Sequence, residues 1–147
     1  MKKHGQITAF YFETLVLIVV FVAVILVLTQ VFGAARVKSG EAKDLTNAVS
    51  LAQNAAEAVA SADEPEDVLA LLDEGGSARM LEGAPVTTVR ACYDDDRRPD
   101  ANGQTTVDVT WEPDGDLVSS RITVSREGLA APVYELDTAV YVKEAGA

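Results

Sequence analysis

An uncharged apolar segment near the N-terminus constrains this chain more than any other feature. From Thr14 to Ala35 there are 22 residues without a charged side chain, and positions 15–28 read LVLIVVFVAVILVL. At about 1.5 Å rise per residue, such a helix extends about 33 Å, enough to cross a hydrocarbon layer of about 30 Å. The segment is apolar on every side and lacks the polar face of a surface helix. We therefore predict a retained membrane helix.

Two other interpretations of this segment are a buried helix in a soluble domain and a cleaved secretory signal. The present run is uniformly apolar and lacks a polar face, which favours a membrane helix over a helix of a soluble domain. The apolar region of a signal peptide is about 7–15 residues long and ends at a small-residue cleavage site. The present run is longer and continues through Val31–Ala35. Both alternatives therefore fit the sequence less well than a membrane helix.

Charge is distributed unevenly along the chain. The 12 basic and 23 acidic residues give a net charge of −11, of which residues 1–38 carry +3 and residues 39–147 carry −14. An acidic body repels phosphate, so we predict no nucleic-acid contact. Basic residues flank the apolar segment almost equally on both sides, and charge alone only slightly favours a cytoplasmic N-terminus and an extracytoplasmic body. The flanking residues are Lys2, Lys3, Arg36, Lys38 and Lys43.

Few residues in the acidic body could carry catalytic chemistry. The only histidine is His4, so no Ser/His/Asp triad, Cys/His pair or zinc site of His and Cys ligands can form in the body. The sequence also lacks a glycine-rich phosphate loop. We predict a protein that is not an enzyme and uses no cofactor. The single Cys92 is either a strand residue packed inward or an unpaired thiol available for cross-linking.

The segment 37–62 predicts a helical continuation of the membrane segment. It contains no proline, and its only glycine, Gly40, is a candidate position for a bend. Apolar residues recur at steps of three and four, which predicts one buried stripe on this helix. The residues of the predicted stripe are Leu45, Val49, Ala52, Ala56 and Val59.

The remaining residues, 63–147, predict a small head that is mostly β-sheet. A short helix is predicted at Pro65–Leu72, ended by Gly75-Gly76. Short connections, including the Asp114-Gly115 turn, predict an antiparallel meander of the last three strands, covered on its apolar face by the Leu45–Val59 stripe. The fold class is therefore α+β. The predicted strands are 86–93, 105–111, 117–126 and 133–142.

Acidic residues cluster in two predicted turns and have two interpretations. Their oxygens could bind calcium, or they could belong to solvated turns. Neither cluster has the spacing of an EF-hand loop, and Arg97-Arg98 adds opposing charge, which favours solvated turns. The candidate ligands are Asp94, Asp95, Asp96, Asp100 and Asn102 in the longer loop, and Asp114 and Asp116 in the hairpin turn.

This order of features resembles bacterial type IV pilin-like proteins. The resemblance is carried by Lys2-Lys3-His4-Gly5, by Gln6 through Glu13-Thr14-Leu15, and by the apolar run to Ala35. The stretch Leu51–Glu57 and the last strands, Arg121–Ser125 and Val133–Tyr141, look most like minor pilins and I-type minor pseudopilins of secretion systems. The likeness extends over the whole chain, although its local motifs are loose.

The resemblance implies a type IV pilin-like fold with four parts. These are a basic leader (1–5), an assembly helix (6–36), its amphipathic continuation (37–62) and the head (63–147). It also implies membrane lipid, other pilin-like subunits, an assembly platform and a prepilin peptidase as partners, and incorporation into a surface filament. The alternative is a single-pass tethered protein, of the tight-adherence type or a lone binding domain, that does not polymerise.

Two leader cleavage positions and one assembly residue follow from the resemblance. Cleavage is expected after Gly5, which frees Gln6, or after Ala9, which frees Phe10. The family normally has its glutamate at the fifth position after cleavage, whereas Glu13 is eighth after Gly5 and fourth after Ala9. The resemblance suggests that Glu13 meets the N-terminal amine of a neighbouring subunit. The alternative is that Glu13 lies at the headgroup boundary beside Lys2 and Lys3.

Overall fold

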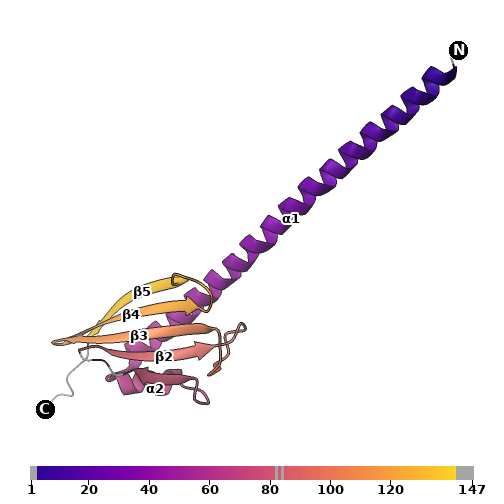
Figure 1. The fold of residues 1–147 in the computed structure, drawn as a ribbon. Helices are drawn as coiled ribbons and strands as arrows, with labels where there is room; N and C mark the ends of the chain where they lie inside the picture. Colours follow the sequence, from indigo (N-terminus) through magenta and orange to yellow (C-terminus); the bar gives the residue numbers. More distant parts are fainter. Residues whose placement is uncertain (1–2, 82, 84, 142–147) are drawn as a thin grey trace. The chain divides into compact units, whose positions relative to one another are not determined.

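The computed structural model describes residues 3–81, 83 and 85–141, with the backbone alone for residues 3–8. The chain divides into two compact units, Met1–Ala42 and Lys43–Ala147, which we call the N-terminal unit and the head. The head contains the last part of α1 and all the other elements (Figure 1). In chain order the elements are α1 (Lys3–Ser61), α2 (Pro65–Leu72), β1 (Ala78–Leu81), β2 (Thr87–Tyr93), β3 (Thr105–Asp114), β4 (Leu117–Arg126) and β5 (Tyr134–Tyr141).

The N-terminal unit consists of the first part of α1. The helix continues through Gly33 and Gly40 without ending at either of them. A glycine inside a helix costs about 1 kcal/mol relative to alanine, because the unfolded chain has more backbone freedom to lose. A methyl group added at either glycine would meet nothing within 4 Å. Packing within the chain therefore does not require glycine at these positions.

In the head, α1 buries a face that is made mostly of alanine. The prediction that this segment covers the sheet is confirmed, because its buried residues share one core with the strands. The predicted stripe was partly wrong, since Leu45 is 47 % exposed and Val49 and Ala56 are only half-buried. Small side chains let a helix lie close to a sheet, which a hydrophobicity pattern does not reveal. The buried residues of α1 are Ala48, Leu51, Ala52, Ala55, Ala58 and Val59, and Ala62, directly after the helix, is buried as well.

The five strands form one antiparallel sheet in the order β1-β2-β3-β4-β5, which is a simple meander. The predicted α+β class, antiparallel strands and meander are confirmed. The sequence predicts the last strand at 133–142; in the structure β5 begins at Tyr134 and ends at Tyr141, and Val142 lies outside the described residues. The sequence did not predict β1, whose residues Ala78–Leu81 all favour helix. Pairing with β2 imposes the strand there, with Ala78 opposite Ala91 and Leu81 opposite Thr88.

The short elements between α1 and β4 follow local rules of sequence. The carboxylate of Asp67 accepts hydrogen bonds at 3.2 Å from the backbone N–H groups of Asp63 and Glu64, which caps the start of α2. This predicted helix is confirmed at Pro65–Leu72 (α2 in Figure 1). It packs on β1 and β2. The β3–β4 hairpin turns at Gly115, whose φ of 64° favours glycine.

The core lies between one face of the sheet and the helices. Strands β2, β3 and β4 alternate buried and less buried residues, so every second side chain faces this core. Ile122 is fully buried and Trp111 is 6 % exposed, whereas Tyr134 is only half-buried at the edge of the sheet. The other sheet face is polar and carries some of the candidate sites described below.

Candidate functional site

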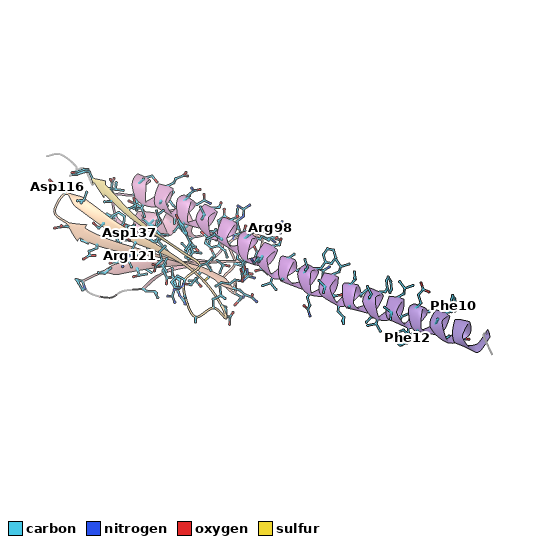
Figure 2. The ribbon with its side chains drawn as sticks, turned by 90° about the horizontal axis from the view of Figure 1, so that it is seen from above. Phe10, Phe12, Arg98, Asp116, Arg121 and Asp137 are labelled. Atoms are coloured by element: carbon cyan, nitrogen blue, oxygen red, sulfur yellow. The ribbon has the colours of Figure 1, made fainter. Side chains whose placement is uncertain are left out.

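The first candidate site is the surface of the N-terminal unit. Of the helices that the structure describes, α1 alone is long and apolar enough to cross a membrane, and none of its most apolar window is buried. Large apolar side chains from Phe10 to Phe32 are 46–69 % exposed. Figure 2 shows the rings of Phe10 and Phe12 standing away from the helix. The chain itself does not bury this surface, which supports a membrane anchor over a helix buried in a soluble core.

The predicted cleavage and assembly residues lie along this same helix. Gly5 and Gln6 belong to α1, and their side chains lie outside the described residues. Ala9, Phe10 and Glu13 are helical and exposed. No ion pair to Glu13 occurs within the part of the chain whose side chains are described. Nearby, the Thr14 hydroxyl donates to the Phe10 carbonyl at 2.9 Å, so this polar group is satisfied within the helix.

The acidic loop between β2 and β3 uses its carboxylates to hold the backbone. One oxygen of Asp94 accepts hydrogen bonds at 2.8 Å from the N–H groups of both Asp96 and Arg98. Asp100 accepts one at 2.9 Å from the N–H of Asn102. These are the local turns that aspartate favours. Among the described residues, no group of three or more His, Cys, Asp or Glu side chains is placed to hold a metal ion.

The second acidic candidate is the β3–β4 hairpin. Asp114 is the last residue of β3, and Asp116 occupies the turn beside Gly115. Both residues are exposed (Asp116 is labelled in Figure 2). The structure does not bring them together with the carboxylates of the β2–β3 loop into one group that could hold a metal.

Arg126 connects three parts of the head through contacts that the sequence analysis did not predict. Its guanidinium forms ion pairs with Asp44 in α1 and, at 2.8 Å, with Asp95 in the β2–β3 loop. Arg97 of the same loop donates to the Ser50 hydroxyl in α1 at 3.1 Å. Arg126 and Asp44 are 82 residues apart, so only the folded topology brings them together. The loop is thereby tied to both the helix and the sheet.

Cys92 lies on the opposite side of the sheet from that expected for a core residue. The alternation along β2 places Ala91 and Tyr93 in the core and Cys92 on the polar face, where it is half-buried. The interpretation of Cys92 as packed inward was therefore wrong. Its neighbours on both sides in β2 are buried. Because successive side chains of a strand point to opposite faces, the side chain of Cys92 points to the polar face. The thiol is free.

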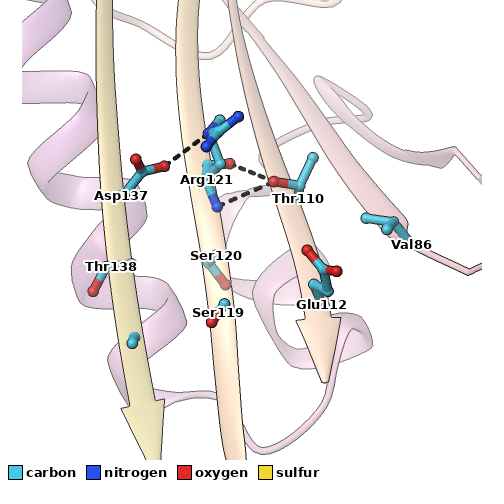
Figure 3. Close-up of a pocket in the computed structure, with 9 residues that line it drawn as sticks. Val86, Thr110, Glu112, Ser119, Ser120, Arg121, Asp137 and Thr138 are labelled. Atoms are coloured by element: carbon cyan, nitrogen blue, oxygen red, sulfur yellow. Dashed lines mark hydrogen bonds and ion pairs between the residues drawn. The ribbon is translucent and has the colours of Figure 1, made fainter. Parts of the chain in front are cut away.

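The polar face carries a shallow hollow of about 560 Å³ over β3, β4 and β5 (Figure 3). Arg121 donates to the carboxylate of Asp137 at 2.8 Å, and the hydroxyl of Thr110 accepts from the Arg121 backbone N–H. The hydrogen bond to Asp137 raises the pKa of the Arg121 guanidinium. The hollow can form hydrogen bonds with a polar group through its hydroxyls and carboxylates. Its lining also includes Val86, Glu112, Ser119, Thr138 and Ala139.

A second ion pair on this face joins β2 to β3. Arg90 contacts both carboxylate oxygens of Asp108 at 2.7 Å, in the two-pronged geometry that arginine favours. The hydrogen bond to Asp108 raises the pKa of Arg90. The two residues are directly opposite each other in the register, so this pair stabilises the alignment of β2 and β3. The pairing depends on the register between β2 and β3, which the sequence analysis did not predict.

Comparison with known proteins found no relative of this chain. No family model, no curated protein and no solved structure matches it. The resemblance to type IV pilin-like proteins thus stays a prediction from the residues that carry it.

Proposed function

We propose that this chain is a non-catalytic, membrane-anchored subunit of a pilin-like filament, a minor pilin or pseudopilin of a secretion, adhesion or DNA-uptake system. One observation carries the proposal: the surroundings of α1 change along its length. Its apolar side chains are exposed from Phe10 to Phe32, whereas from Ala48 to Val59 they pack into the core of the head. A single helix thus carries an exposed apolar surface that suits lipid in its first part and packs into a folded head in its last part.

The proposed mechanism is mechanical and depends on the exposed apolar surface. A helix that is apolar all round is stable in lipid, because its backbone groups are hydrogen-bonded internally. It can equally pack against identical helices, since van der Waals contacts between helices replace contacts with lipid tails. In this proposal the helix holds the subunit in the membrane until an assembly platform extracts it. The helix then packs among other subunits, and the head supplies lateral contacts.

Glu13 is the residue proposed to guide this assembly. A carboxylate at the centre of a membrane costs roughly 2.5–3.5 kcal/mol, and less near an interface, so it usually has a partner. No ion pair to Glu13 occurs among the described side chains. The resemblance supplies a partner, the N-terminal amine of a neighbouring subunit freed by a prepilin peptidase. This arrangement places the N-terminus on the cytoplasmic side before assembly and the head outside.

The test compares Glu13→Ala with Thr14→Ala, each expressed with the wild-type chain in cells that hold the assembly machinery. Glu13→Ala is expected to insert in the membrane normally but to enter filaments at least fivefold less often. Thr14→Ala removes a hydroxyl that bonds only within its own helix, and it is expected to behave as wild type. The measurement is the ratio of each variant to wild type in membrane and in sheared filament fractions.

Equal entry of both variants into filaments would contradict the role of Glu13. Sequencing the mature N-terminus distinguishes the proposed subunit from a simple tether. A chain beginning at Gln6 or Phe10 indicates processing by a prepilin peptidase. An intact Met1 in the assembled or membrane-bound protein would contradict that processing.

A further inference from the structure

A groove of about 420 Å³ opens in the head between α1, α2 and the β2–β3 loop. It lies on the side of the sheet that the helices cover, away from the hollow beside Arg121. Its volume is within the range of small-molecule sites, about 300–1,000 Å³. Leu71 contributes an apolar wall, and its side chain is 57 % exposed although it belongs to a short helix that buries Val68 and Leu72.

Tyr93 lines this groove with a side chain that is only 8 % exposed. Its ring belongs to the core, and no hydrogen bond from its hydroxyl occurs among the described residues. A buried tyrosine hydroxyl usually has a partner. In the same part of the chain, Ser120 carries the one unpartnered side-chain oxygen that is closed to solvent. The Tyr93 hydroxyl therefore keeps access to solvent through the groove and is free to bind a ligand there.

The charges around the groove favour a cation. Glu57 from α1 and Glu74, which follows α2, both line it, and neither forms an ion pair among the described residues. The basic residue of the lining is Arg97, whose guanidinium donates to the hydroxyl of Ser50 at 3.1 Å. Residues 39–147 carry a net charge of −14, so the field of the whole head also attracts cations.

We propose that this groove binds a primary alkylammonium group, either of a free amine or of a lysine side chain. An ammonium has three N–H donors and no acceptor, and the carboxylates of Glu57 and Glu74 and the oxygen of Tyr93 can accept from it. The apolar stem of the ligand then lies against Leu71, as lysine stems lie on apolar surfaces. Among the described residues no group of three or more His, Cys, Asp or Glu side chains is placed to hold a metal, so an organic cation fits better. The proposal does not depend on the filament function.

Three small compounds of one shape test the charge that the groove selects. Butylammonium, 1-butanol and butanoate are titrated into the isotope-labelled full chain in micelles of a nonionic detergent, and NMR follows the backbone amide of Glu74. Butylammonium is expected to shift this signal saturably, with a Kd about tenfold or more below those of the other two compounds. Equal binding of 1-butanol, or tighter binding of butanoate, would overturn the proposal.

Substitutions in the groove test its residues with butylammonium as the ligand. Glu74→Gln and Tyr93→Phe are each expected to raise the Kd about threefold or more, because each removes a hydrogen-bonding group. Arg97→Gln is expected to lower the Kd, since it removes a repelling charge. Glu127→Gln is the matched control, because Glu127 is exposed and outside the groove, and it is expected to leave the Kd unchanged. Equal weakening by Glu74→Gln and Glu127→Gln would show that net charge alone attracts the amine and would contradict the site.

A capped tripeptide with a central lysine distinguishes the two sources of the ammonium. Tighter binding of the tripeptide than of butylammonium supports the site with a lysine of a partner protein as its ligand. Weaker binding of the tripeptide supports the site with a free amine as its ligand. Failure of both compounds to shift the Glu74 amide would overturn the proposal and leave the filament function untouched.

Discussion

The N-terminal unit and the head use the same apolar residues in opposite surroundings. Ile25 in the N-terminal unit is 46 % exposed, whereas Ile122 in the head is fully buried. The difference lies in the pattern. The apolar residues of the N-terminal unit form an unbroken run, while those of the head alternate with polar residues along strands. A run with no polar face requires an apolar solvent or other helices around it, whereas an alternating pattern builds its own core.

Separating the two units is the most direct way to test this comparison. A chain limited to Lys43–Ala147 is expected to fold cooperatively, because it retains every residue of the buried core. It is expected to lose membrane association completely, since it lacks the whole apolar run. Flotation with lipid vesicles measures the second property and denaturant unfolding the first. A fragment that is unfolded, or that still floats with vesicles, would show that the units are not independent in this way.

Matched isoleucine substitutions sharpen the comparison at the level of single side chains. Ile122→Ala is expected to lower the free energy of unfolding of the head by about 2–5 kcal/mol, through lost burial and the cavity left behind. Ile25→Ala is expected to change that free energy by less than about 0.5 kcal/mol, because its side chain has no part in the core. Fluorescence of Trp111, the sole tryptophan, reports unfolding of the head in detergent. Similar losses for both variants would refute the contrast.

Substituting two arginines of the head compares a partly buried ion-pair network, at Arg126, with an exposed ion pair, at Arg121. Arg126→Gln is expected to destabilise the head by about 1–2 kcal/mol, because Asp44 and Asp95 both lose a charged hydrogen-bond donor. The expected cost of Arg121→Gln is below about 1 kcal/mol, since its side chain is 64 % exposed and water screens the pair. Chemical denaturation of both variants side by side measures the difference. A larger loss for Arg121→Gln would reverse this ranking.

The smallest predicted effect concerns Tyr93 at alkaline pH. Burial, followed by the nearby Glu74 and Cys92, raises the pKa of Tyr93 above its ordinary value of 10.0. The unfolded chain therefore loses this proton first, and the head loses stability as pH rises above about 10. Tyr93→Phe is expected to make the unfolding free energy decrease less steeply with pH. Tyr141→Phe is expected to leave this decrease unchanged, because Tyr141 is 80 % exposed. Unfolding free energies between pH 8 and 11 provide the measurement. An identical slope in all three proteins would exclude Tyr93 as the cause.

Local patterns in the sequence predicted much of the fold. The uncharged run predicted a long apolar helix, the strand-like runs predicted β2 to β5, and Pro65 followed by Gly75-Gly76 predicted α2. The Asp114-Gly115 dipeptide predicted the tight hairpin. Each of these depends on neighbours in the chain, so a linear pattern is sufficient to reveal it.

Tertiary structure decided the features that depend on residues far apart in the chain. Pairing with β2 made a strand of Ala78–Leu81 against its helical preference, and close approach to the sheet selected the alanine face of α1 over the bulkier stripe. The contact of Arg126 with Asp44, and the outward side of Cys92, likewise follow from topology and register. The amino-acid sequence by itself determined the exposed apolar surface and strands β2 to β5 of the head. Only folding decided which faces meet, because packing and pairing energies depend on residues far apart in the chain.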